Sequence, residues 1–153
     1  MAGTVTRQEL EKQVGEPLGV SDWFLIEQTR VNDFADVTLD HQFLHVDPER
    51  ARATPFGGTI AHGLLTLSMI VHLCLIFIPK LADTKLVVNY GFDKVRFSAP
   101  VKVGKRIRAR VKLLGVEERK PGNVIVKVDV TIEIENEEKP ALVAEWLSLH
   151  VVG

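Results

Sequence analysis

The chain has 153 residues, a length typical of one domain that buries its own core without disulfides or metal. It is 46% hydrophobic and 25% charged, with a formal net charge of -1, so nothing draws the whole molecule to nucleic acid or to an anionic membrane. The single cysteine, Cys74, excludes an intrachain disulfide and lies in an apolar run where a thiol packs. The N-terminal residues are polar and lack the apolar stretch of a signal peptide. We therefore expect one domain, residues 1–153, in the cytoplasm.

Local signals in the first third of the chain predict short helices around one strand. Thr6 and Glu9 fit a capping box ahead of a short helix. Residues 22–28 are rich in strand-forming side chains, and Thr29 is placed to cap a second helix. Residues 47–49, Asp-Pro-Glu, form a strong helix start, because Asp caps, Pro fits the first turn and Glu suits the positive helix end.

An apolar segment from Leu64 to Ile78 predicts a long helix, over about residues 61–78, that is buried on all sides. A helix that crosses a membrane needs about 20 apolar residues. This segment is shorter, contains His72 and ends at Pro79. We interpret it as a core helix and expect no membrane partner.

The second half of the chain has the pattern of an antiparallel sheet. Apolar and polar residues alternate over 106–113 and 126–135, which predicts long strands with one wet face. Further strands are expected over residues 85–97 and 141–152, the last covered on both faces. The predicted fold class is α+β, with one long helix packed on a sheet of about five strands.

Asp40 and His45 are the first candidates for chemistry. They lie in the sequence Asp-His-Gln-Phe-Leu-His, just before a capped helix. A carboxylate and an imidazole placed close together can share one water, with one group taking its proton and the other orienting it. Histidine suits this work because its ordinary pKa lies near neutrality. By itself the spacing is weak evidence, since a loop Asp and a nearby His are more often a cap and a surface residue.

His62 and Gly63 stand at the predicted start of the long helix. Backbone N–H groups at a helix start have no partner within the helix and attract developing negative charge. A glycine there lets a thioester carbonyl approach closely. The sequence therefore offers an acid/base pair, Asp40 and His45, followed by a candidate oxyanion donor at Gly63.

The segment DHQFLHVDPERARATPFGGTIAHGLLTLS, residues 40–68, resembles the MaoC-like family of (R)-specific enoyl-CoA hydratases. It is most similar to the branch labelled nodulation-protein-N-like, as is the later stretch NYGFDKVRFSAPV, residues 89–101. The resemblance covers most of the chain. It implies a hot-dog fold, in which a long central helix is wrapped by a curved antiparallel sheet.

The resemblance also implies roles for single residues. Asp40 and His45 match the family's catalytic pair, which adds water to C3 of a trans-2-enoyl-CoA and supplies the proton at C2. Gly63 matches the glycine whose amide holds the thioester oxygen. The expected product is an (R)-3-hydroxyacyl-CoA, and no cofactor is expected besides the coenzyme A of the substrate. The family also implies a homodimer whose two sheets join edge to edge.

Three positions depart from the commoner family pattern. Leu39, Gln42 and Phe43 stand where many members have Gly, Asn and Pro. Gln42 still offers a side-chain amide, so we keep it with His62 as a candidate substrate-binding residue. None of these changes removes the Asp40 and His45 pair.

Several alternatives stay open at this point. A hot-dog thioesterase would act on the same kind of substrate, and a non-catalytic acyl-CoA-binding subunit would have the same fold. His41 and His45 have a spacing compatible with two metal ligands, but zinc needs at least a third, and we expect no metal. The basic residues between Lys102 and Lys112 form a solvated strand face or a contact for the phosphates of coenzyme A.

Overall fold

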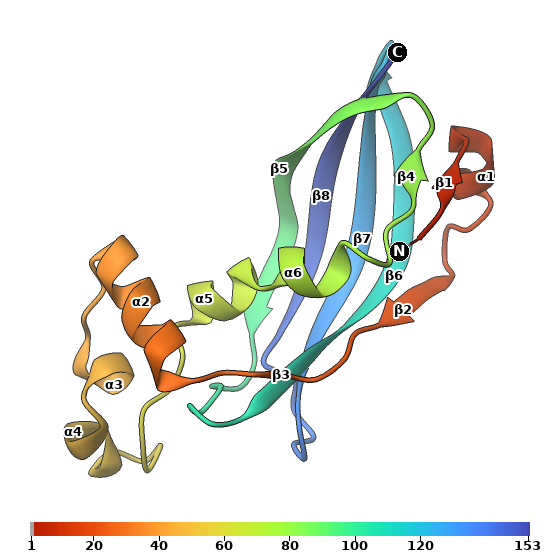
Figure 1. Cartoon of the computed structure of the whole chain (residues 1–153). Coiled ribbons are helices and arrows are strands. Elements are labelled where there is room, and N and C mark those ends of the chain that lie inside the picture. Colours follow the sequence, from red (N-terminus) through yellow and green to blue (C-terminus); the bar gives the residue numbers. More distant parts are fainter. Residues whose placement is uncertain (1) are drawn as a thin grey trace.

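The computed structural model describes residues 2–153, and it places a long curved antiparallel sheet against a row of short helices (Figure 1). The helices are α1 (Arg7–Glu11), α2 (Gln28–Thr38), α3 (Phe43–Val46), α4 (Pro48–Arg52), α5 (Gly63–Ser68) and α6 (Ile70–Cys74). The strands are β1 (Thr4–Val5), β2 (Pro17–Val20), β3 (Phe24–Leu25), β4 (Lys80–Leu81), β5 (Thr84–Phe97), β6 (Arg106–Lys120), β7 (Asn123–Ile134) and β8 (Leu142–Val152).

The main sheet has the strand order β2-β6-β7-β8-β5, with β3 also pairing with β6, and all of its pairs are antiparallel. The predicted alternation is confirmed on β7, where Val128, Val130 and Ile132 are at most 1% exposed and the residues between them are half-buried. Every residue of β8 is buried or half-buried, as expected for a strand covered on both faces. The α+β class and the antiparallel sheet predicted from the sequence are therefore confirmed.

The prediction of one long helix over residues 61–78 is wrong. The chain forms α5 and α6, with Met69 between them. The Ser68 hydroxyl donates to the carbonyl of Leu64 at 2.7 Å, a local bond of the kind that bends helices. The segment is also not buried on all sides, because Leu64 and Leu75 are 62% and 51% exposed.

One face of this segment makes the core contact with the sheet. Leu65, Ile70, Leu73 and Cys74 are at most 5% exposed and belong to the same apolar cluster as the inward residues of β6 and β7. In Figure 1, α5 and α6 lie across the sheet. Among the described residues, no helix combines the length and the apolar character that a membrane crossing requires.

Two of the predicted helix caps are confirmed. The Thr6 hydroxyl accepts a hydrogen bond from the Glu9 amide, and the Glu9 carboxylate accepts one from the Thr6 amide, which completes the capping box. The Asp47 carboxylate accepts from the Arg50 amide at 3.0 Å and caps α4. Asp47 is therefore engaged in folding the segment that follows His45.

Two neighbouring predictions need correction. Thr29 does not cap α2, because this helix begins at Gln28 after Glu27, which makes no side-chain cap bond. The strand expected over residues 22–28 is reduced to β3, since Phe24 and Leu25 alone pair with β6 there. The chain then leaves the sheet and enters the group of helices α2, α3 and α4, which lies beyond one end of α5 (Figure 1).

Candidate active site

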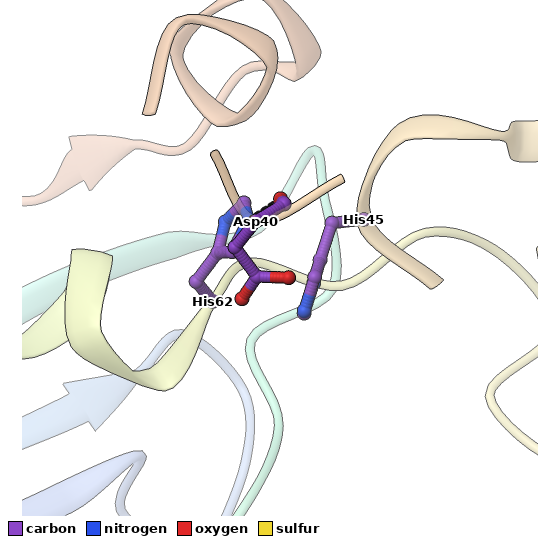
Figure 2. Close-up of side chains that lie close together, drawn as sticks. All are labelled: Asp40, His45 and His62. Atoms are coloured by element: carbon purple, nitrogen blue, oxygen red, sulfur yellow. Dashed lines mark hydrogen bonds between the residues drawn. The ribbon is translucent and has the colours of Figure 1, made fainter. Parts of the chain in front are cut away.

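Asp40, His45 and His62 converge from three separate places in the helical region (Figure 2). Asp40 lies between α2 and α3, His45 lies on α3, and His62 immediately precedes α5. One oxygen or nitrogen atom of each side chain lies within 4.8 Å of those of the other two. The structure thus brings together the pair proposed from the sequence and His62, which was a candidate substrate-binding residue.

A hydrogen bond fixes the tautomer of the neutral His45 ring. The side chain is buried, and its Nδ1 lies 2.7 Å from the main-chain carbonyl oxygen of Ile60. A carbonyl oxygen only accepts hydrogen bonds, so Nδ1 carries the proton of the neutral ring and Nε2 keeps a free lone pair. His45 also lines the main cavity of the site. Its free nitrogen is therefore suited to take a proton from a bound water.

His62 contacts both members of the pair. Its Nε2–H donates to the main-chain carbonyl of Asp40 at 3.0 Å, and its ring stacks on that of His45 with centroids 3.8 Å apart (Figure 2). Phe34 of α2 lies against the ring of His62, with centroids 4.9 Å apart. His62 is only 3% exposed, and its Nδ1 has no hydrogen-bond partner among residues 2–153. These contacts fit a residue that positions the loop of Asp40.

Asp40 follows a sharp turn of the chain. Leu39 ends α2 with φ of 62°, in the left-handed region that glycine adopts more easily. The turn leaves Asp40 exposed and its side chain beside the ring of His45 (Figure 2). The Asp40 carboxylate accepts from the backbone amide of Gln42 at 3.4 Å. The turn is therefore kept although leucine replaces the family glycine at position 39, and the left-handed backbone of Leu39 costs roughly 1–2 kcal/mol in strain.

Gln42, a predicted substrate-binding residue, does not line the cavity. Its side chain is exposed, and the residue stands at the N-terminus of α3 without making a side-chain cap bond. The residue that does bring an amide group to the site is Gln28, on the first turn of α2. The substrate-binding role of Gln42 therefore stays a prediction, since its side chain does not line the cavity.

A cavity of about 300 Å³ opens beside His45. Its lining is mostly apolar and combines the loop before α5, the start of α5 and the segment that follows β5. The lining residues are His45, Phe56, Ile60, Ala61, Gly63, Thr66, Phe97, Ser98, Ala99, Pro100, Val101 and Ala141. A mostly apolar cavity with a few polar side chains is typical of a site that binds a small molecule.

Gly63 lines the same cavity as His45 and is the first residue of α5. An amide in that position has no partner within the helix and is available to an oxygen of a ligand. A Cβ at Gly63 would lie 3.0 Å from the ring of Phe97, closer than ordinary van der Waals contact. The close packing against Phe97 gives a direct reason for glycine at this position.

Three other residues with potentially reactive side chains lie outside the cluster of Asp40, His45 and His62. His41 is exposed and pairs with Asp36 at 2.8 Å, so His41 and His45 do not form a common metal site. Burial raises the pKa of the Cys74 thiol to about 12, which leaves it uncharged and unreactive at neutral pH. His72 is exposed and packs edge-on against Phe24.

The basic stretch on β6 lies opposite acidic residues of β7. Arg108 and Arg110 each contact the carboxylate of Glu133 at 2.6 Å, and Arg106 lies 3.9 Å from Glu135. These side chains do not line the cavity beside His45. The arrangement favours a charge-paired strand face over a site for the phosphates of coenzyme A.

Comparison with known proteins identifies the family and the relatives that this sequence is similar to. The sequence matches the family description "MaoC like domain" over residues 9–135. It is 45% identical over 142 residues to "Nodulation protein N" of Rhizobium leguminosarum bv. viciae, covering 92% of this chain and 88% of that protein. It is 50% identical over 150 residues to "3-hydroxyacyl-thioester dehydratase Z" of Mycobacterium tuberculosis, covering 94% of each.

The fold also has solved counterparts. The structure described as a monoamine oxidase regulatory protein from Archaeoglobus fulgius superposes on this chain with a TM-score of 0.82. The matched region covers 99% of this chain and 97% of that chain. Its sequence identity of 23% means that the likeness concerns the fold. The hot-dog fold and the resemblance to nodulation protein N, both expected from the sequence, are confirmed.

Proposed function

The chain belongs to the MaoC-like domain family, and we propose that it is an enoyl-CoA hydratase that reversibly adds water to trans-2-enoyl-CoA to give (R)-3-hydroxyacyl-CoA. One observation carries the proposal. The buried His45, with its free Nε2 beside the Asp40 carboxylate, lines the same apolar cavity as the Gly63 amide. The relative named as a 3-hydroxyacyl-thioester dehydratase supports a hydro-lyase reaction, and the (R) configuration follows from the resemblance to the (R)-specific hydratases.

In the hydration direction, His45 Nε2 takes a proton from water while the water oxygen forms its bond to C3 of the enoyl group. The electron pair of the double bond between C2 and C3 moves toward the thioester carbonyl, whose oxygen becomes negative. His45 Nε2–H then gives this proton to C2 as the thioester carbonyl re-forms, so that a hydrogen at C2 and a hydroxyl at C3 are the net change and His45 is neutral again. The Asp40 carboxylate orients the water and stabilises the charged form of His45 during this step.

The Gly63 amide has the complementary role at the other end of the reacting group. As negative charge develops on the thioester oxygen, a fixed N–H near it stabilises the transition state more than the ground state. His62 holds the main chain of Asp40 through its Nε2–H and supports the ring of His45 by stacking. We therefore assign it a positioning role and give it no proton transfer.

We propose that the reaction uses no cofactor; water addition to an enoyl thioester involves no net electron transfer and therefore needs no redox group. The same three side chains form a cluster that could hold a metal ion, so the point is tested with a chelator. Activity should be unchanged after dialysis against EDTA. A loss that Zn²⁺ restores would make the cluster a metal site and would overturn this part of the proposal.

Hydration of crotonyl-CoA and of a longer trans-2-enoyl-CoA tests the proposal. Loss of the enoyl-thioester absorbance is followed while a thiol reagent reports free coenzyme A in a parallel sample. We expect loss of the absorbance without release of thiol. Thiol release at the same rate would instead identify a thioesterase, and no change in either signal with either substrate would favour an acyl-binding subunit.

The edge strand β5 supports a homodimer. It pairs with β8 on one side, and no strand among residues 2–153 pairs with its other edge. Several of its large apolar side chains are between 41% and 54% exposed: Leu86, Val87, Val88, Tyr90, Phe92 and Phe97. An edge with so much exposed apolar surface is normally covered by a partner. We propose that β5 of a second copy covers it and that the dimer acts in the cytoplasm, where acyl-CoA substrates are metabolised.

The mass of the protein in solution, measured by light scattering after size exclusion, tests the dimer. The wild type should have about twice the mass of the 17.1 kDa chain. Val88→Lys places a charge on the exposed face of β5 and should shift the protein toward the monomer. A monomeric wild type would contradict the dimer without bearing on the reaction.

A further inference from the structure

Gln28 joins the two chain segments that carry the His45 ring and its hydrogen-bond partner. Its Nε2 donates to the main-chain carbonyl of His45 at 2.7 Å. Its Oε1 accepts from the Thr59 hydroxyl at 2.6 Å. Thr59 adjoins Ile60, the residue whose carbonyl accepts from the His45 ring. One amide group thus spans from α3 to the loop that precedes α5.

The orientation of this amide is fixed by its partners. The two hydrogens of Nε2 go to the His45 carbonyl and to the Asn32 side-chain oxygen at 2.9 Å, while Oε1 takes the Thr59 hydroxyl. A rotated amide would place its oxygen against the His45 carbonyl, which is also an acceptor. His45 and Thr59 are 8% and 7% exposed, so water is a poor substitute for either bond.

The segment that carries His45 has little stability of its own. α3 is four residues long, too short to persist without contacts from the rest of the fold. Two direct bonds tie it to the loop before α5, from the Ile60 amide to the Leu44 carbonyl and from the His45 ring to the Ile60 carbonyl. Gln28 adds the bridge that closes this arrangement into a ring of hydrogen bonds.

We propose that Gln28 is a positioning residue that holds the His45 ring in its reactive orientation, with Nδ1 bonded to the Ile60 carbonyl and Nε2 free toward Asp40. The proposal rests on the proposed function for its catalytic meaning. Its structural part concerns the protonation form and orientation of His45, and it is measurable without any substrate. Positioning matters because a displacement of about 1 Å can lower a rate about 10²-fold.

Two variants separate hydrogen bonding from packing. Gln28→Ala removes all three side-chain bonds, whereas Gln28→Glu keeps the size and the acceptor for Thr59 but loses the donor to the His45 carbonyl. We expect each to lower kcat at least about tenfold, with KM changed less than about threefold, because the substrate cavity is not altered. Gln8→Ala is the matched control. It makes the same change at an exposed glutamine of α1, outside the hydrogen bonds of Gln28, and should keep full activity.

The direct readout is the ¹⁵N NMR spectrum of the His45 ring. The wild type should show the Nδ1–H form, and both Gln28 variants should show a mixture of the two neutral forms, with Gln8→Ala like the wild type. Thr59→Val, which removes one hydroxyl and keeps the shape of the side chain, should give a smaller change in the same direction. This measurement stays valid if the protein proves to hydrolyse thioesters or only to bind them.

Each outcome decides the proposal. A mixed His45 spectrum in Gln28→Ala and Gln28→Glu, in variants with the circular dichroism spectrum of the wild type, supports it. An unchanged Nδ1–H spectrum in both variants overturns it, whatever the activity does. If the spectrum changes as expected while the wild type fails to hydrate either enoyl-CoA, the positioning role stands and the proposed reaction fails.

Discussion

The sheet and the helical segment that holds the site are stabilised in different ways. Strands β5 to β8 form long ladders, and their inward side chains, such as Val130 and Ile132, are fully buried. The segment from α2 to the start of α5 consists of short helices joined by single hydrogen bonds, such as those of Gln28 and His62. Apolar burial is summed over many residues, whereas each polar bond in the site has one specific partner.

This contrast has a consequence for mutation. A change in the sheet should alter the free energy of unfolding and leave the activity intact. A change in the site should lower the activity and leave the free energy of unfolding nearly unchanged. Active sites commonly depend on a few groups held in fixed geometry, at some expense in stability. Substitutions in the two regions can therefore be compared directly.

The largest expected effect is on activity. Asp40→Asn and His45→Gln should each lower kcat/KM for enoyl-CoA hydration by roughly 10²- to 10⁴-fold, the usual contribution of general acid/base groups. His41→Gln is the matched control, since His41 is adjacent to Asp40 but pairs with Asp36 on the surface. Steady-state kinetics on the purified proteins measure the loss. Full activity in either Asp40→Asn or His45→Gln would refute the assignment of the pair.

The opposite pattern is expected for the core of the sheet. Ile132→Ala removes a fully buried side chain and should lower the free energy of unfolding by about 2–5 kcal/mol, with kcat/KM changed little below the melting temperature. Thr131→Ala, on the half-buried face of the same strand, should change stability by no more than about 0.5 kcal/mol. Urea unfolding measures both. An equal loss in the two variants would mean that burial does not distinguish the faces of β7.

A smaller effect is expected from the charged face of the sheet. Glu133 bonds to both Arg108 and Arg110, but all three side chains are partly exposed. Glu133→Gln should therefore cost no more than about 1 kcal/mol of stability, and less in high salt. Enoyl-CoA affinity should be unchanged. A large rise in KM for this variant would show that the charged face contacts coenzyme A after all.

The smallest expected effect depends on pH and comes from His150 in the sheet. It is 3% exposed, its Nε2 lies 3.1 Å from the Ser148 hydroxyl, and burial lowers its pKa below the ordinary value of 6.5. The unfolded state therefore binds the proton more readily than the folded state. The associated stability is complete above pH 6.5 and is lost as the pH falls toward the lowered pKa.

His150→Leu tests this point. The variant has no titrating group at the position, so its free energy of unfolding should fall less steeply between pH 6.5 and 5 than that of the wild type. Urea unfolding at a series of pH values gives the two slopes. Identical slopes would show that His150 does not contribute to the acid sensitivity of the sheet.

The same contrast explains what the sequence could predict. The strands were predictable because burial on one face imposes an alternation that is visible in residues such as Val128 and Val130. Asp40, His45 and Gly63 were found through a long motif, and the caps at Thr6 and Asp47 through local spacing. Each of these signals lies within a short stretch of the chain.

The features that the sequence did not reveal depend on contacts between distant residues or on local competition. Gln28 bonds to residues 17 and 31 positions away, so nothing near it in the sequence marks it. The stacking of His62 on His45 is likewise a product of the fold. The long helix was overpredicted because the apolar pattern continues through Met69, which separates α5 from α6, and past Cys74, where α6 ends.

The proposed role of Asp40 and His45 is to add water at C3 of an enoyl thioester. Mass spectrometry of the products formed from trans-2-enoyl-CoA in H₂¹⁸O gives the sharpest test. The wild type should place one ¹⁸O atom at C3 of an intact 3-hydroxyacyl-CoA, and His45→Gln should place almost none in the same time. Label in a free carboxylate, accompanied by free coenzyme A, would refute this role and show that water attacks the thioester carbonyl.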